Sequence, residues 1–197
     1  LLKIGNLNNE IVEVIGNIND PLSDEKISLA VFNKNDEFSE ECEAEAIAWG
    51  DEVDPTMYPQ RADLRDLPFC TIDPVDAKDF DDAIYFDEKK REIYVAIADV
   101  SEYVTPYSPI DAEAKTRGFS IYFPHKAVPM LPRNLSENIC SLKPNTARLA
   151  FCFKITLGEE GEVAKEELLE AVIVSQRRFN YDEVDQILRG EREDEIG

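Results

Sequence analysis

The chain has 197 residues, of which 43% are hydrophobic, and a formal net charge of −21. This length is sufficient for one substantial core, and the apolar content excludes a disordered chain. No apolar run approaches the roughly 20 residues that span a bilayer, and no signal-peptide pattern is present, so we expect no membrane partner.

The first 67 residues contain few strong structural signals. Two strands are expected near 3–5 and 10–16, joined by a turn at 6–9, and the chain begins at Leu1 inside the first of them. This start indicates a piece of a longer protein. Residues 20–67 are predicted to be a linker that packs on a neighbouring unit. One helix is expected there, from Ser39 as its N-cap to about Trp49.

Regular structure is predicted more densely from residue 68 onwards. The sequence Ser108-Pro109 is typical of a helix start, and that helix should end at Gly118. Prolines 129 and 132 argue against regular structure between them. The other expected elements are a strand at 69–72, a hairpin of 83–86 and 92–100, strands at 149–157 and 165–174, and a helix at 181–189. The pattern predicts an α+β fold with a mixed or antiparallel sheet and flanking helices.

The charge is distributed unevenly along the chain. A strongly acidic protein is an unexpected partner for nucleic acid, but residues 111–154 carry seven cations and three acids. An ordinary mixed surface and a phosphate-binding surface both fit this segment. Its cations are Lys115, Arg117, Lys126, Arg133, Lys143, Arg148 and Lys154.

The four cysteines and the single histidine argue against a zinc site. Cys42, Cys70, Cys140 and Cys152 form no C-x-x-C pair, and His125 has no neighbouring residue of ligand type. Free cysteines among apolar residues suit a reducing compartment, so we expect a cytoplasmic protein.

Four aspartates gather in the sequence TIDPVDAKDFDDA, which covers residues 71–83. They are Asp73, Asp79, Asp81 and Asp82, and Asp76 lies among them. Carboxylates this close repel one another and raise one another's pKa unless a cation lies between them. The cluster therefore points to a hard divalent ion such as Mg²⁺ or Mn²⁺. Because neighbouring strand residues point to opposite faces, Asp81 and Asp82 can share one site only if the backbone bends.

Three interpretations of this cluster compete. An EF-hand calcium loop starting at Asp79 requires a glycine at Ile84 and a glutamate at Lys90, and both requirements fail. A solvated acidic loop is the usual meaning of an acidic run. The third interpretation is a metal site for phosphodiester hydrolysis, in which carboxylates hold the ion and one of them orients the attacking water.

Several ordered motifs resemble the ribonuclease II / ribonuclease R family of RNB-type exoribonucleases. They lie between about residues 61 and 180, and their details are more similar to ribonuclease R. The motifs are RADLRDLP at 61–68, the aspartate sequence at 71–83, VAIADVS at 95–101, RGFSIYFP at 117–124, VPMLP at 128–132 and LSENICSL at 135–142. The resemblance implies three regions: the end of an OB-type cold-shock domain at 1–19, a linker at 20–67, and the N-terminal half of the catalytic domain at 68–197.

The resemblance implies a 3′-to-5′ exoribonuclease that degrades single-stranded RNA processively to nucleoside 5′-monophosphates with Mg²⁺, for which Mn²⁺ is the alternative cofactor. Asp73 and Asp82 correspond to metal ligands, Asp79 to a ligand or supporting residue, and Asp81 to the residue most important for the chemical step. Asp76 lies outside this set. The intact protein is expected to be monomeric, with no affinity for DNA, and half of the active site is expected outside this chain.

The remaining candidates concern RNA binding. The resemblance implies that Tyr122 stacks on the 3′-terminal base, whereas the residues alone fit core packing beside Phe119 and Phe123. Arg117, Lys126 and Arg133 are candidate phosphate ligands, although each fits an ordinary surface cation too. Two other functions stay open: a non-catalytic module that binds RNA or protein, and a phosphatase with Asp79-Phe-Asp81 as its D-x-D motif.

Overall fold

The computed structural model describes residues 2–4, 11–17, 19–20, 23–32, 34–124 and 126–192. The expected turn at 6–9 and His125 lie outside these residues. Within them, no helix is both long and apolar enough to cross a membrane. The strands are β1 (Leu2–Ile4), β2 (Ile11–Val14), β3 (Ala62–Asp63), β4 (Phe69–Ile72), β5 (Asp82–Asp87), β6 (Glu92–Ala98), β7 (Ile121–Tyr122), β8 (Ala127–Val128), β9 (Ala147–Leu157) and β10 (Val163–Phe179).

The α-helices are short. Three of them were expected, two from the caps Ser39 and Ser108 and one at 181–189 without an assigned cap. They are α1 (Ser23–Val31), α2 (Glu40–Ala48), α3 (Pro109–Arg117) and α4 (Tyr181–Leu188). Ser39, Ser108 and Asn180 cap α2, α3 and α4 by accepting a hydrogen bond from a backbone N–H in the first turn. Other helical turns are the 3-10 segments Pro55–Met57 and Val100–Glu102 and the π-helical turn Leu135–Ile139.

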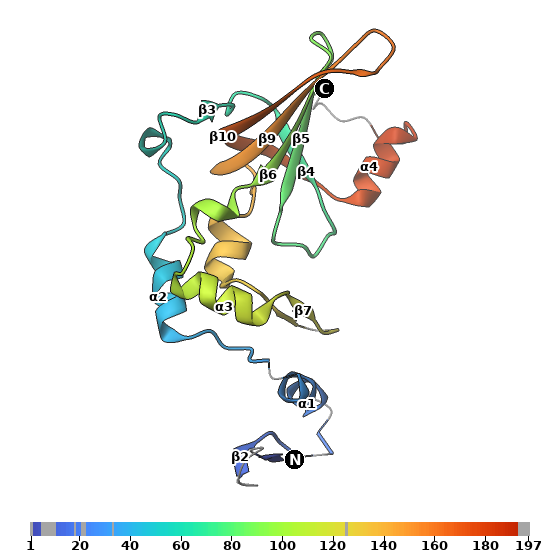
Figure 1. Ribbon diagram of the computed structural model, residues 1–197. Coiled ribbons are helices and arrows are strands. Elements are labelled where there is room, and N and C mark those ends of the chain that lie inside the picture. The colour runs from blue at the N-terminus through green and yellow to red at the C-terminus, as the bar shows by residue number, and fades with distance from the viewer. Residues whose placement is uncertain are drawn as a thin grey trace.

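A six-stranded mixed sheet forms the main body, in the order β3-β10-β4-β5-β6-β9. β10 also pairs with β9, so five of the strands close into a ring (Figure 1). β10 runs parallel to β3 and β4 and antiparallel to β9, and the remaining pairs in this sheet are antiparallel. The predicted α+β class with a mixed sheet is confirmed.

Two apolar clusters hold the body together. The first lines one face of the curved sheet and includes Phe69, Phe80, Ala83, Tyr94, Ala96, Cys152 and Ile173. The second joins the other face of the sheet to α2, α3 and the π-helical turn, through Cys42, Ala46, Tyr103, Ile110, Leu135, Leu149 and Val172. The helix in the predicted linker therefore packs on the sheet unit, as expected, while the domain boundaries themselves remain a prediction.

Several observed elements differ from the expectations, among them the short strands β3, β7 and β8, which were not predicted. Residues 23–31 form helix α1, although the only helix expected between 20 and 67 was the one that starts at Ser39. β10 continues to Phe179, five residues beyond the predicted strand end at 174. The π-helical turn follows the proline pair, where no element was expected. Figure 1 shows the loop between β4 and β5 extending from the sheet toward β7.

Candidate active site

Asp73 is the first residue of the aspartate loop, which covers residues 73–82 between β4 and β5. Its N–H donates to the carbonyl of Phe179 at 3.0 Å, which extends the parallel pairing of β4 and β10 by one bond. The side chain is buried, and its Oδ2 atom has no hydrogen-bond donor among the described residues. A buried carboxylate oxygen without a donor is costly, so this atom is suited to an external cation.

Phe80 anchors the middle of the loop. Its ring is buried in the first apolar cluster, and Ala83, three residues on, is buried in the same cluster. In a regular strand residues 80 and 83 would face opposite sides, so the backbone bends between them, as a shared aspartate site requires. Asp79 and Asp81 flank Phe80, and both line a hollow outside the core.

The carboxylates are close enough to perturb one another. Desolvation raises the pKa of Asp81, and the charges of Asp79, Asp82 and Asp73 raise it further. Desolvation also raises the pKa of Asp73, with a smaller contribution from Asp82. Mutual repulsion of this kind is relieved when a cation binds between the groups, so the oxygen donors fit a hard divalent ion.

The carboxylates do not form a closed cage. Among the described residues, no group of three or more acidic, cysteine or histidine side chains is arranged to hold a metal ion. Asp82 is exposed at the start of β5 and lies outside the lining of the hollow, although its charge acts on both Asp73 and Asp81. Asp73, Asp79 and Asp82 as ligands therefore remain a prediction.

The hollow has a volume of about 910 Å³ and lies between the aspartate loop and the hairpin β7–β8. Tyr122, the last residue of β7, lines it with 73% of its surface exposed. Tyr122 therefore does not pack in the core, and its ring is free to contact a ligand. The cations that line the hollow are Lys78, Lys126 and Arg133.

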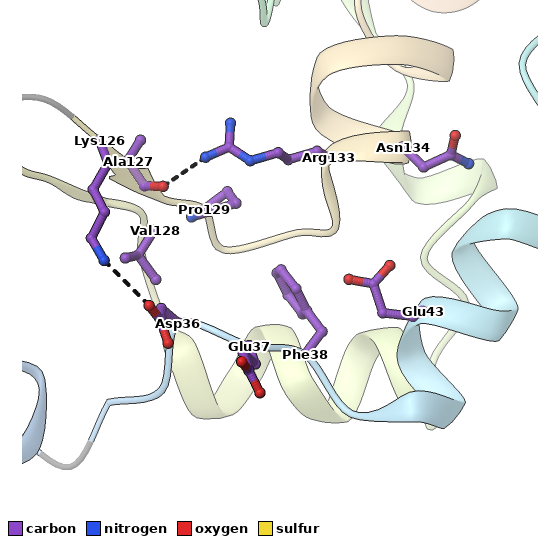
Figure 2. Close-up of a pocket in the computed structure, with 10 residues that line it drawn as sticks. All are labelled: Asp36, Glu37, Phe38, Glu43, Lys126, Ala127, Val128, Pro129, Arg133 and Asn134. Carbon is purple, nitrogen blue, oxygen red and sulfur yellow. Dashed lines mark hydrogen bonds and ion pairs between the residues drawn. The ribbon is translucent and has the colours of Figure 1, made fainter. Parts of the chain in front are cut away.

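Lys126 and Arg133 also line a second hollow of about 570 Å³, which β8 and the segment 36–38 border (Figure 2). Lys126 forms ion pairs with Asp36 at 3.2 Å and Glu25 at 3.4 Å. Arg133 donates to the carbonyl of Ala127 at 2.7 Å and forms an ion pair with Glu137. Both side chains remain partly exposed, so a phosphate can reach them. It would have to compete with the ion pairs that each cation already forms.

The structure does not support Arg117 as a phosphate ligand. Its side chain is only 5% exposed, and the guanidinium lies 3.6 Å from the ring centre of Phe38. The nitrogens are also occupied: Nε pairs with Glu113 at 3.0 Å and Nη2 donates to the carbonyl of Glu37 at 2.5 Å. Arg117 instead ties α3 to the segment before α2.

Two residues that hold the loop were not predicted. Arg178, near the end of β10, donates from Nη2 to the carbonyls of Pro74 and Val75, the latter at 2.7 Å, and its charge lowers the pKa of Asp73. Ser141 hydrogen-bonds to the backbone beside Asp79. Arg178 lies four residues beyond the predicted strand end at 174, and only its pairing with β4 reveals its role. Ser141 lies within the motif LSENICSL, but nothing in that motif indicates a contact with the aspartate loop.

Comparison with known proteins identifies the family to which this chain belongs. The RNB domain family matches residues 61–196, and the family described as the ribonuclease R second OB domain matches residues 1–29. The chain is 41% identical to ribonuclease R of Helicobacter pylori over 188 residues, which cover 95% of this chain and 29% of the relative. It is 44% identical to ribonuclease R of Escherichia coli over 146 residues, 73% of this chain and 18% of the relative.

A solved structure agrees with these matches. Mycoplasma genitalium RNase R, in complex with ribose-methylated single-stranded RNA, superimposes with a TM-score of 0.86 at 37% identity. The match covers 95% of this chain and 30% of that one. The chain thus spans less than a third of the length of these relatives. Its sheet, its aspartate loop and these matches show that the chain belongs to the RNB family of ribonucleases and is similar to ribonuclease R.

Proposed function

We propose that the intact protein carrying this chain is a 3′-to-5′ exoribonuclease that degrades single-stranded RNA processively to nucleoside 5′-monophosphates, with Mg²⁺ or Mn²⁺ as its cofactor. The proposal rests on the aspartates of the loop, whose charges raise the pKa values of Asp73 and Asp81. The buried Oδ2 atom of Asp73, at the edge of a large hollow, has no hydrogen-bond partner among the described residues. The chain supplies part of the catalytic domain, so the activity is proposed for the whole protein.

Asp73, Asp79 and Asp82 would hold the cation, which supplies charge neutralisation at the phosphate and acidifies a bound water. Asp81 would orient the attacking water and accept its proton on a carboxylate oxygen. The water oxygen forms a bond to phosphorus while the P–O3′ bond breaks. The 3′ oxygen leaves on the shortened RNA, and the terminal nucleotide departs as a 5′-monophosphate.

The hollow offers groups for the RNA itself. Tyr122 would stack on the 3′-terminal base, an interaction that tolerates any sequence. Lys126 and Arg133 would contact phosphates in exchange for their present ion pairs. We propose a monomer that binds neither DNA nor membranes.

A cytoplasmic location fits the chemistry of the cysteines. All four are free thiols, and three of them are buried. Burial raises the pKa of Cys140 to about 12 and those of Cys42 and Cys152 to about 11. Thiols held this firmly protonated are unreactive packing residues, as expected in a reducing compartment.

The test is the Asp81→Asn variant of the intact protein, assayed with uniformly labelled single-stranded RNA and Mg²⁺. Loss of the proton acceptor should lower the rate of mononucleotide release by about 10²- to 10⁴-fold. Asp76→Asn removes an exposed carboxylate from the same loop and serves as the matched control, with an expected rate near that of the unsubstituted protein. An unsubstituted protein that releases no mononucleotides, or an active Asp81→Asn variant, would contradict the proposal.

The competing function is a non-catalytic module that binds RNA or protein. It is favoured by one observation, the absence among the described residues of a closed group of metal-binding side chains. The same assay separates the two functions, because such a module would bind the labelled RNA and leave it intact with either metal.

A further inference from the structure

Ser141 reaches the aspartate loop from a distant part of the chain. It follows the π-helical turn and is only 1% exposed. Its Oγ accepts a hydrogen bond from the N–H of Phe80 at 3.0 Å and donates one to the carbonyl of Lys78 at 2.9 Å. One hydroxyl therefore bridges the backbone on both sides of Asp79.

The neighbours of Ser141 extend this contact. The N–H of Leu142 donates to the carbonyl of Phe80 at 2.9 Å, so both backbone groups of Phe80 are bonded to residues 141 and 142. Ser141 is itself held by buried Arg148, whose Nε donates to the Ser141 carbonyl at 2.9 Å. The buried ring of Phe80 completes the anchor.

This anchor opposes the repulsion between the aspartates. Asp79 and Asp81 lie on either side of Phe80 and line the same hollow, so their like charges repel each other and favour separation of the loop. Groups that bind a metal must be held to within about 0.5 Å of their working positions by surrounding hydrogen bonds. The hydroxyl of Ser141 supplies two such bonds, to the carbonyl of Lys78 and the N–H of Phe80, on either side of Asp79.

We propose that Ser141 is a positioning residue for the aspartate loop, whose hydroxyl fixes the backbone around Asp79 and so sets Asp79 and Asp81 in place to bind a divalent cation. The inference rests on the proposed nuclease function. Ser141 does not touch the reacting atoms; it acts through the two aspartates.

The experiment uses Ser141→Ala in the intact protein, with two measurements. Binding of Mn²⁺ alone is followed by electron paramagnetic resonance, and RNA hydrolysis is followed with saturating Mg²⁺. Loss of the supporting hydroxyl should weaken Mn²⁺ binding or lower kcat by about 10- to 100-fold, the usual effect of removing an outer-shell partner. KM for single-stranded RNA should not change, because Ser141 is buried away from the RNA-binding groups.

Two further variants separate positioning from general stability. Ser141→Thr keeps the hydroxyl and should recover most of the Mn²⁺ affinity. Ser175→Ala removes another buried hydroxyl, which donates to the carbonyl of Arg177 at 3.2 Å, and should leave Mn²⁺ affinity and kcat unchanged. Equal losses in Ser141→Ala and Ser175→Ala, or normal Mn²⁺ binding and kcat in Ser141→Ala, would overturn the inference.

Asp81→Asn distinguishes failure of the inference from failure of the proposed function. An inactive Asp81→Asn beside a fully active Ser141→Ala overturns the positioning role alone, while an active Asp81→Asn overturns the nuclease proposal. If Ser141→Ala does not fold, amide hydrogen exchange in the unsubstituted protein tests the inference instead. The Phe80 amide should exchange orders of magnitude more slowly than an unprotected amide, and rapid exchange there would overturn the inference.

Discussion

Tyr122 and Arg117 show how the environment of a single residue decides its role. Both lie in the segment 117–124 that resembles the family motif. The ring of Tyr122 is exposed in the hollow, whereas the guanidinium of Arg117 is enclosed by Phe38, Glu113 and a backbone carbonyl. A sequence identifies the charge of an arginine but not its burial, because the ring of Phe38 and the carbonyl of Glu37, which enclose the guanidinium, lie about 80 residues earlier in the chain.

Tyr122→Ala should keep RNA hydrolysis but lengthen the final product. Stacking on a base is worth roughly 1–3 kcal/mol, so its loss releases short RNA before the last cleavages. The length of the end product on a denaturing gel measures this effect. Tyr107→Ala, which removes an even more exposed tyrosine beside α3, is the control and should leave product length unchanged. An unchanged end product in Tyr122→Ala would exclude Tyr122 from the RNA path.

At the scale of elements, a buried ion pair fastens the segment before β3 to the end of β6. The side chains of Arg61 and Asp99 are 5% and 2% exposed, and Nη2 lies 2.7 Å from the Asp99 carboxylate and 2.9 Å from Glu102. Asp99 also caps the 3-10 turn at 100–102 by accepting the N–H of Glu102. Asp99 therefore both pairs with Arg61 and caps the turn that follows β6.

Arg61→Met should destabilise the protein by about 3–5 kcal/mol, because it leaves a buried carboxylate unpaired. Urea denaturation measures the change in the free energy of unfolding. Adding Asp99→Asn should recover part of the loss, since the uncompensated charge is then gone. The control is Arg65→Met, which breaks the exposed pair of Arg65 with Asp63 and should cost far less, because solvent screens that pair. Similar losses in both single variants would contradict the assignment.

Elements with local stop and start signals were predictable, and those fixed by distant contacts were not. The capping residues Ser39, Ser108 and Asn180 mark three helices within a few residues of sequence. The end of β10 contains the polar run 176–178, which hides the strand, and only pairing with β4 extends it to Phe179. The same reason applies to the site. The aspartates are evident in the sequence, whereas the side chains that hold their loop, Ser141 and Arg178, lie far along the chain.

At the scale of the whole molecule, the chain contains 42 acidic and 21 basic residues. The aspartate loop adds repulsion between neighbouring carboxylates to this excess of negative charge. The pKa values of Asp73 and Asp81 are raised on folding above the usual value of about 3.9. A group of this kind binds protons more tightly in the folded state. Its stabilising effect is present at low pH and is lost as pH rises through the raised pKa.

Without divalent cations, Asp73 and Asp81 should therefore destabilise the protein as pH rises above the ordinary aspartate pKa of about 3.9, in opposition to carboxylates whose pKa is lowered, such as Asp87. Asp81→Asn should remove part of this destabilisation and raise the melting temperature at pH 7. Added Mg²⁺ should stabilise the unsubstituted protein more than the variant. Scanning calorimetry over this pH range measures both effects.

The control for this prediction lies at the other end of β5. A hydrogen bond from Lys90 lowers the pKa of Asp87, so this carboxylate stabilises the fold at neutral pH. Asp87→Asn should accordingly shift the melting temperature at pH 7 in the opposite direction. If both variants stabilise the protein equally, overall net charge and not the aspartate loop governs the pH dependence.

The length of β10 also determines the order in which the molecule assembles. Its last residues, 175–179, pair with β4, about 105 residues earlier in the chain, and the Phe179 carbonyl bonds the N–H of Asp73. During synthesis, β4 and the aspartate loop therefore wait for a strand that emerges about 100 residues later, and non-local pairing of this kind is slow. The nascent chain consequently acquires its ordered cluster of negative charge late, together with the apolar core, which also contains Ile173 of β10.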